Sequence, residues 1–160
     1  MKSRLIGVSL LLVSSLTYAQ TKLTKENIRK DSIIKVDIID PAVQESQGEA
    51  PDWSALNIEI GKKYDAIYAD RTVTKGIIYF TYGKDWPAFT AALVRYTEKY
   101  EDHNNLPLLN KNAAMVAQFS TDKKELETAL GWSRHTLDKE PGNAGYQKTY
   151  DALKTKIAGN

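Results

Sequence analysis

The segment from Thr121 to Asn143 constrains the fold more than any other, because it carries both a start and a stop signal for one amphipathic helix. Asp122 is a typical N-cap, and Glu125 follows three residues later, as in a capping box. Pro141 and Gly142 then end the pattern. The apolar or small residues of this segment fall on one face at helical spacing: Leu126, Ala129, Leu130, Ser133 and Leu137.

A second capped helix begins at Asp85, with Pro87 in the first turn, where its missing amide hydrogen costs little. It continues through Leu93 and Tyr100. Phe89 of this helix and Ala129 of the other occupy equivalent positions, 40 residues apart. Each helix is predicted to pack against a helix that precedes it in the chain. These partner helices are expected at Asp70–Tyr82 and Asn110–Phe119.

Two more amphipathic helices are predicted at the flanks, from Asp52 to Tyr64 and from Asn143 to Ile157. The order is then helix, hairpin, hairpin, helix, which indicates an all-α domain of about six helices over residues 52–160. Helices at both ends of such an array commonly cover the apolar face that a terminal hairpin would expose. A pair of ordinary helical hairpins without a repeat relationship is the alternative.

The motifs DWSAL, KDWPAF, LNKNAA, STDKKELETALGWS and EPGNAGYQKTYDAL, between Asp52 and Leu153, give this region its strongest resemblance. It resembles the tetratricopeptide-like helical region that follows the thioredoxin fold in some exported bacterial thioredoxin-family proteins. The resemblance implies antiparallel helical hairpins of tetratricopeptide type. The redox domain of that family needs about 100 residues and usually a C-x-x-C pair. Residues 20–51 are too few for such a domain, and the chain has no cysteine, so the activity of that domain is not carried over.

The N-terminus has the pattern of a secretory leader. Lys2 and Arg4 precede an apolar run from Leu5 to Leu16, and small residues before Gln20 suit cleavage after Ala19. We therefore expect a signal peptide over residues 1–19 and export to the periplasm or beyond, without membrane association after cleavage. A retained anchor is the alternative, although the apolar run is short for a membrane span.

Charge and cysteine content narrow the possible partners. Without the two leader cations, 20 basic residues face 20 acidic ones, so the domain has no field suited to nucleic acid. The chain has no cysteine, which removes thiol chemistry and disulfide staples.

Residues 20–51 do not continue the helical pattern and are expected to form an N-terminal segment with a linker. Thr24–Ile28 could start a short helix. Ser32–Ile39 is rich in β-branched residues and partly alternating, which predicts a strand, or a poorly ordered segment. With no second strand evident, this segment either docks on the helices or pairs with another chain.

No catalytic motif was found, and we expect neither an enzyme nor a cofactor or metal site. His103 lies in a predicted loop and His135 on a predicted helix, and neither belongs to a metal-binding spacing. The sequence therefore predicts a protein-interaction or scaffold module whose partner is a protein or peptide. The alternative is an accessory or remnant of a periplasmic thiol-disulfide system that lacks its own redox domain.

The inner face of the first helix of each hairpin is the expected contact surface, because repeat proteins bind ligands on their concave side. In this register the candidate partner-binding residues are Arg71, Thr74, Ile78, Tyr82, Lys111 and Gln118, with Ala114 beside them. The tyrosines admit two interpretations, an aromatic groove, or packing in the core or in a half-buried interface. They are Tyr64, Tyr68, Tyr79, Tyr82, Tyr96 and Tyr100.

Overall fold

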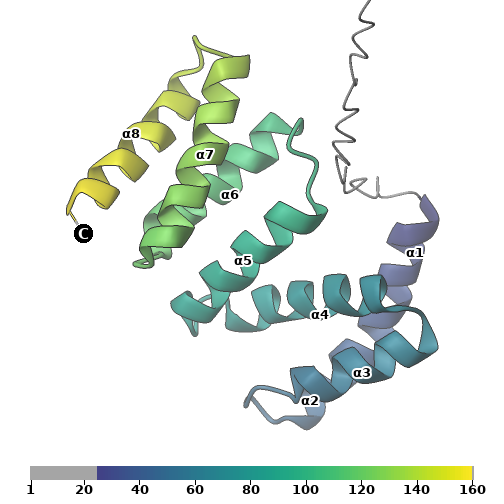
Figure 1. Ribbon diagram of the computed structural model, residues 1–160. Coiled ribbons are helices and arrows are strands. Elements are labelled where there is room, and N and C mark those ends of the chain that lie inside the picture. The colour runs from purple at the N-terminus through teal and green to yellow at the C-terminus, as the bar shows by residue number, and fades with distance from the viewer. Residues whose placement is uncertain (1–24, 160) are drawn as a thin grey trace, which may run out of the picture.

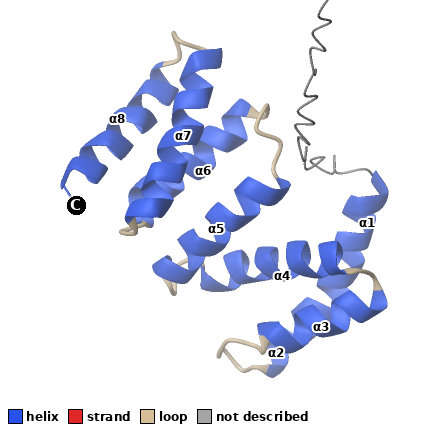
Figure 2. Cartoon of the chain, viewed as in Figure 1, coloured by secondary structure: helices blue, strands red, loops and turns tan. Residues whose placement is uncertain are grey.

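The computed structural model describes residues 25–159, and every regular element in that range is helical (Figure 2). The first helix runs from Lys25 to Glu45 without a break. Its parts are α1 (Lys25–Ile34), a π-helical turn (Lys35–Ile39) and α2 (Asp40–Glu45). We call this unit the N-terminal helix. The others are α3 (Trp53–Lys63), α4 (Ala66–Thr81), α5 (Trp86–Tyr100), α6 (Leu106–Phe119), α7 (Lys123–Lys139) and α8 (Ala144–Gly159). The predicted leader, residues 1–19, lies outside the described residues.

Short acidic or amide side chains begin six of these helices. Each accepts a hydrogen bond from a backbone amide in the first turn, which satisfies a donor that has no partner within the helix. The caps predicted at Asp85 and Asp122 are confirmed, at 3.0 Å to Ala88 N and 2.8 Å to Lys124 N. The complete set is Asp52, Asp65, Asp85, Asn105, Asp122 and Asn143.

Consecutive helices from α3 to α8 pack against each other, and α5 and α6 also contact α7 and α8, respectively. Figure 1 shows the result as a stack of helical hairpins, with α4 and α5 joining the N-terminal part to the part formed by α6, α7 and α8. The described part of the chain is therefore all-α and repeat-like. All six predicted helices are present, but α4 and α6 each begin four residues earlier than the predicted Asp70 and Asn110. Within residues 25–159, no helix is both long and apolar enough to cross a membrane.

The larger core, which we call the C-terminal core, lies between α5, α6, α7 and α8. The stripe predicted on α7 faces inward, with Leu126, Ala129 and Ser133 fully buried. Phe89 is only 1% exposed, so both equivalent positions are core positions as predicted. The buried members of this core are Phe89, Leu93, Leu109, Ala113, Val116, Leu126, Ala129, Trp132 and Leu153.

A second core, the N-terminal core, joins the N-terminal helix to α3 and α4. Its buried residues are Ile34, Ile38, Ile39, Leu56, Ile60, Ala69 and Val73. The prediction of a strand or poorly ordered segment at Ser32–Ile39 is wrong, because these residues form the end of α1 and the π turn. The physical reason is burial: Ile34, Ile38 and Ile39 lie on one face of a helix, and packing against α3 and α4 overrides the β-propensity of isoleucine. Of the two alternatives given for this segment, docking on the helices is the one observed.

Candidate functional site

A groove of about 600 Å³ separates the N-terminal helix from α4 and its following turn, and we call it the α1–α4 groove. Its volume is within the range of peptide and small-molecule sites. One wall is formed by Ile28, Asp31, Ser32, Lys35, Ile39, Asp40 and Val43. The other is formed by Thr72, Lys75, Gly76, Tyr79, Phe80, Tyr82 and Lys84.

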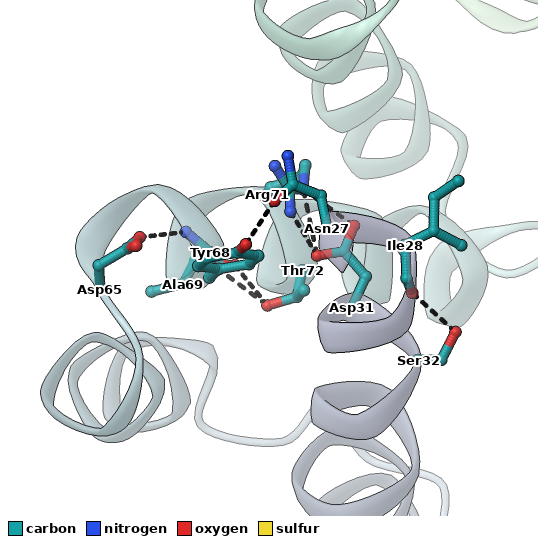
Figure 3. A network of polar contacts seen from close by, with 9 residues as sticks. All are labelled: Asn27, Ile28, Asp31, Ser32, Asp65, Tyr68, Ala69, Arg71 and Thr72. Atoms are coloured by element: carbon teal, nitrogen blue, oxygen red, sulfur yellow. Dashed lines mark hydrogen bonds and ion pairs between the residues drawn. The ribbon is translucent and has the colours of Figure 1, made fainter. Parts of the chain in front are cut away.

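A polar network ties the two walls together at one end of the groove (Figure 3). The guanidinium group of Arg71 donates to both carboxylate oxygens of Asp31, at 2.6 Å from Nη2 and 2.9 Å from Nε. The Tyr68 hydroxyl donates to the side-chain oxygen of Asn27 at 2.5 Å. The contact between residues 27 and 68 and the contact between residues 31 and 71 advance in the same direction along both helices, so the two walls run parallel in a defined register.

The Arg71–Asp31 pair is almost removed from water, with side-chain exposures of 3% and 13%. Burial alone would lower the pKa of Arg71, but hydrogen bonding and the negative charge of Asp31 raise it above its usual value. The guanidinium carbon also lies 4.8 Å from the centre of the Tyr68 ring, a cation–π distance. Arg71 therefore acts as an anchor for the N-terminal helix.

The walls are in tight contact at Gly76, where a side chain would not fit without movement. A Cβ atom at this position would lie 3.0 Å from Trp53 Cζ3 and 3.3 Å from Ile39 Cγ2. Trp53 in turn contacts Phe80 edge to face, with ring centres 5.9 Å apart. Glycine thus permits Ile39 of the N-terminal helix and Trp53 of α3 to meet α4, and this contact closes the base of the groove.

Two exposed tyrosines form the open side of the groove. Tyr79 is 64% exposed and Tyr82 is 56% exposed, both high values for large aromatic side chains. Lys75, Tyr79 and Tyr82 follow the i, i+4, i+7 spacing of a single helix face. Tyr82 rests edge to face on Trp86 and Phe89, with ring centres 5.6 and 5.4 Å apart, so its ring is held against the C-terminal core.

The charges of the groove divide into internal pairs and remaining cations. Asp31 is bound by Arg71, and Asp40 is bound by Lys35 at 2.6 Å. Lys75 lies 6.0 Å from the Tyr96 ring centre, and Lys84 lies 4.3 Å from the Phe80 ring centre. Once the internal pairs are set aside, the lining contributes two ammonium groups and no further carboxylate.

Behind Lys75, burial shifts two ionisable groups. Burial raises the pKa of the Tyr96 hydroxyl to about 12, and the carboxylates of Glu101 and Asp31 add to that effect. Burial also raises the pKa of the Glu101 carboxyl, while the charges of Lys75 and His103 oppose the shift. Both groups therefore keep their protons to a higher pH than usual.

The structure does not gather the six predicted contact residues into one surface. Arg71 and Thr74 are buried, at 2% and 3% exposure, because the N-terminal helix and α5 cover α4 on that side. Ile78 is half-buried against the C-terminal core. Tyr82 lines the groove, whereas the exposed Lys111 and Gln118 lie on α6, outside it. Tyr79 and Tyr82 line the groove, as in the aromatic-groove interpretation. Tyr64, Tyr68 and Tyr100 are half-buried and Tyr96 is buried, as in the packing interpretation.

Sequence reasoning missed Lys75 and Lys84 as site residues, together with the whole wall formed by the N-terminal helix. It named Tyr79 only in the aromatic-groove interpretation of the tyrosines. The spacing of Lys75, Tyr79 and Tyr82 was a usable signal on α4. No comparable signal existed for the second wall, because the segment was expected to form a strand.

The two histidines lie away from the groove. His103 makes a 3.2 Å contact between its ring Nε2 and the carbonyl oxygen of Thr97, and His135 is half-buried on α7. Among the residues that the structure describes, no group of three metal-ligating side chains comes together.

Comparison with known proteins gives no relative for this chain. No protein-family model, no curated protein and no solved structure matches it. The resemblance to tetratricopeptide-like regions of thioredoxin-family proteins therefore remains a hypothesis from the sequence motifs.

Proposed function

We propose that this protein is an exported interaction module of tetratricopeptide type, and that it binds a peptide segment of a protein partner in the α1–α4 groove. The observation that carries this proposal is the pair of exposed tyrosines at a 600 Å³ groove between two firmly anchored helices. Tyrosine is enriched in binding sites because its flat ring contributes contact area while its hydroxyl tolerates water. Export rests on the leader pattern of residues 1–19.

Two features of the walls support binding over a purely structural role. Both walls are fixed before any ligand arrives, by the buried Arg71–Asp31 pair and by the close packing at Gly76. A preformed site loses less conformational entropy when a ligand binds. The groove also leaves its aromatic rings open to solvent, whereas Phe89 and Trp132 of the C-terminal core are enclosed. The Tyr79 ring is therefore not needed to fill either core of this protein, and contact with a partner would explain it.

Site-specific photo-crosslinking tests the proposal. Benzoylphenylalanine is placed at position 79 in the groove and, as the matched control, at Ile67, which is 55% exposed on the same helix but does not line the groove. We expect one partner to crosslink from position 79 and not from position 67, and we expect Tyr79→Ala to weaken binding of that purified partner. Equal crosslinking from both positions would contradict the proposal. A thioredoxin-family protein as the partner would favour the alternative of an accessory to a thiol-disulfide system.

A further inference from the structure

The chemistry of the α1–α4 groove defines a more specific ligand class, and the inference below rests on the proposed peptide-binding function. The groove has three zones along α4: Lys75 at one end, Tyr79 and Tyr82 in the middle, and Lys84 at the other end. An apolar centre between two cationic ends calls for a ligand with an apolar centre and two anionic ends. We propose that the groove binds an extended peptide in which two acidic residues flank a large apolar one.

The charge balance supports an acidic ligand. The two carboxylates of the lining, Asp31 and Asp40, are each bound to a cation of the protein itself. Among residues 25–159, no carboxylate lies within ion-pair distance of Lys84, whose ammonium group rests on the Phe80 ring. Glu101 lies near enough to Lys75 for the charge of that lysine to lower its pKa, but Glu101 does not line the groove. A basic peptide would therefore meet no unpaired carboxylate in the lining.

The dimensions set the spacing of the ligand. The helix from Lys75 to Thr81 is about 9 Å long at 1.5 Å per residue, and Lys84 follows in the turn. An extended peptide rises about 3.3 Å per residue, so acids four residues apart are separated by roughly 13 Å. In an extended chain, side chains at i, i+2 and i+4 point to one side. The sequence that fits is therefore acid, any residue, large apolar residue, any residue, acid.

The turn after α4 helps to present the second cation. Gly83 has a φ of 76°, in the region that glycine adopts without strain. The backbone amide of Lys84 donates to the Thr81 carbonyl at 2.9 Å, which closes the turn. Lys84 thus belongs to a defined turn, and its position relative to Tyr82 is set by the backbone.

Fluorescence anisotropy with labelled peptides on the full chain tests this inference. The probe is a capped peptide with the core Asp-Ser-Phe-Ser-Asp, and the controls carry Lys-Ser-Phe-Ser-Lys or Asp-Ser-Ser-Ser-Asp. We expect the acidic phenylalanine peptide to bind at least tenfold more tightly than either control at low salt. Its affinity should fall as salt rises, because the ends of the groove act through charge.

Charge-reversal variants make the test specific to the groove. The double variant Lys75→Glu and Lys84→Glu should reverse the preference, so that the lysine peptide binds more tightly. The matched control is Lys62→Glu with Lys63→Glu on α3, which should leave the preference unchanged. Circular dichroism should show that both double variants remain helical.

Other outcomes separate this inference from the proposed function. If acidic and basic peptides bind equally and Tyr79→Ala weakens both, the groove binds peptides but the acidic class is overturned. The inference is also overturned if none of the peptides binds while position 79 still crosslinks to a partner. If no peptide binds and no crosslink forms, both the inference and the proposed function fail.

Discussion

The two cores of this protein are built from different kinds of contact. The C-terminal core is held by enclosed aromatic and aliphatic side chains, with Trp86 stacked on Phe119 at 3.7 Å between ring centres. The N-terminal core also has apolar contacts, but a buried ion pair and the close approach at Gly76 define its register. The groove occurs in the second region. Sparse, directional contacts hold two helices at a fixed separation without filling the space between them.

The largest predicted effect is the loss of stability when a large side chain is removed from the C-terminal core. Phe89→Ala removes a ring that is 1% exposed and should lower the free energy of unfolding by about 3–5 kcal/mol. Trp86→Ala should cost less, because Trp86 is only partly buried. Urea unfolding measures both changes. Tyr79→Ala, at 64% exposure, serves as the control and should stay within about 0.5 kcal/mol of the parent protein. A loss for Tyr79→Ala equal to that for Phe89→Ala would break the comparison.

The second prediction concerns the ion pair of the N-terminal region. Asp31→Ala leaves the buried Arg71 guanidinium without its partner and should destabilise the protein by about 3 kcal/mol. Arg71→Met combined with Asp31→Ala should recover part of that loss, because no buried charge then remains. Glu26→Ala breaks an exposed pair with Lys30 on the same helix and should leave stability unchanged. If Asp31→Ala and Glu26→Ala were equally mild, the ion pair would not be the anchor of the N-terminal helix.

The third prediction compares the same substitution, glycine to alanine, in the two regions: at Gly76 in the N-terminal region and at Gly131 on α7. Gly76→Ala should destabilise the protein by about 1–3 kcal/mol, since the new methyl group would press against Trp53 and Ile39. Gly131→Ala, on the exposed face of α7, meets no atom within 4 Å and should stabilise the protein by about 0.5–1 kcal/mol. Thermal melting should therefore move in opposite directions for the same chemical change. A stabilising Gly76→Ala would show that the base of the groove has spare room.

The smallest predicted effect is a loss of stability at alkaline pH. Tyr96 has its pKa raised to about 12, whereas an unfolded tyrosine ionises near pH 10. The folded state therefore retains the proton longer, so its stabilising contribution is complete below pH 10 and is lost as the pH rises from 10 toward 12. Between pH 8.5 and 10.5 the parent protein should lose more stability than Tyr96→Phe, by about 1 kcal/mol or less. Identical pH profiles in urea unfolding would contradict the assigned burial of the hydroxyl.

The sequence predicted the C-terminal region well because its signals are local. Caps such as Asp122, stops such as Pro141 and a stripe through Leu126 and Ala129 all act within one or two helical turns. The N-terminal helix was missed because Ile33, Ile34, Ile38 and Ile39 favour a strand locally, and only burial against α3 and α4 reverses that preference.

The candidate site was predicted only in part for the same reason. Its α4 wall contains Tyr82, which was predicted, but Arg71 was expected to face a partner and instead faces Asp31 across 40 positions of the chain. The apolar and polar spacing within one helix does not indicate a contact between residues that far apart in the sequence. The walls of the groove could therefore be assigned only once both helices were placed in space.

The π turn at Lys35–Ile39 has a further consequence for the groove. Successive residues of an α-helix are offset by about 100° around its axis, so removing one residue from this turn would rotate everything upstream by that angle relative to Ile39. Asp31 would then swing away from Arg71, and Ile28 would leave the groove lining. The single wide turn thus sets the angular phase between the buried isoleucines and the residues that face α4.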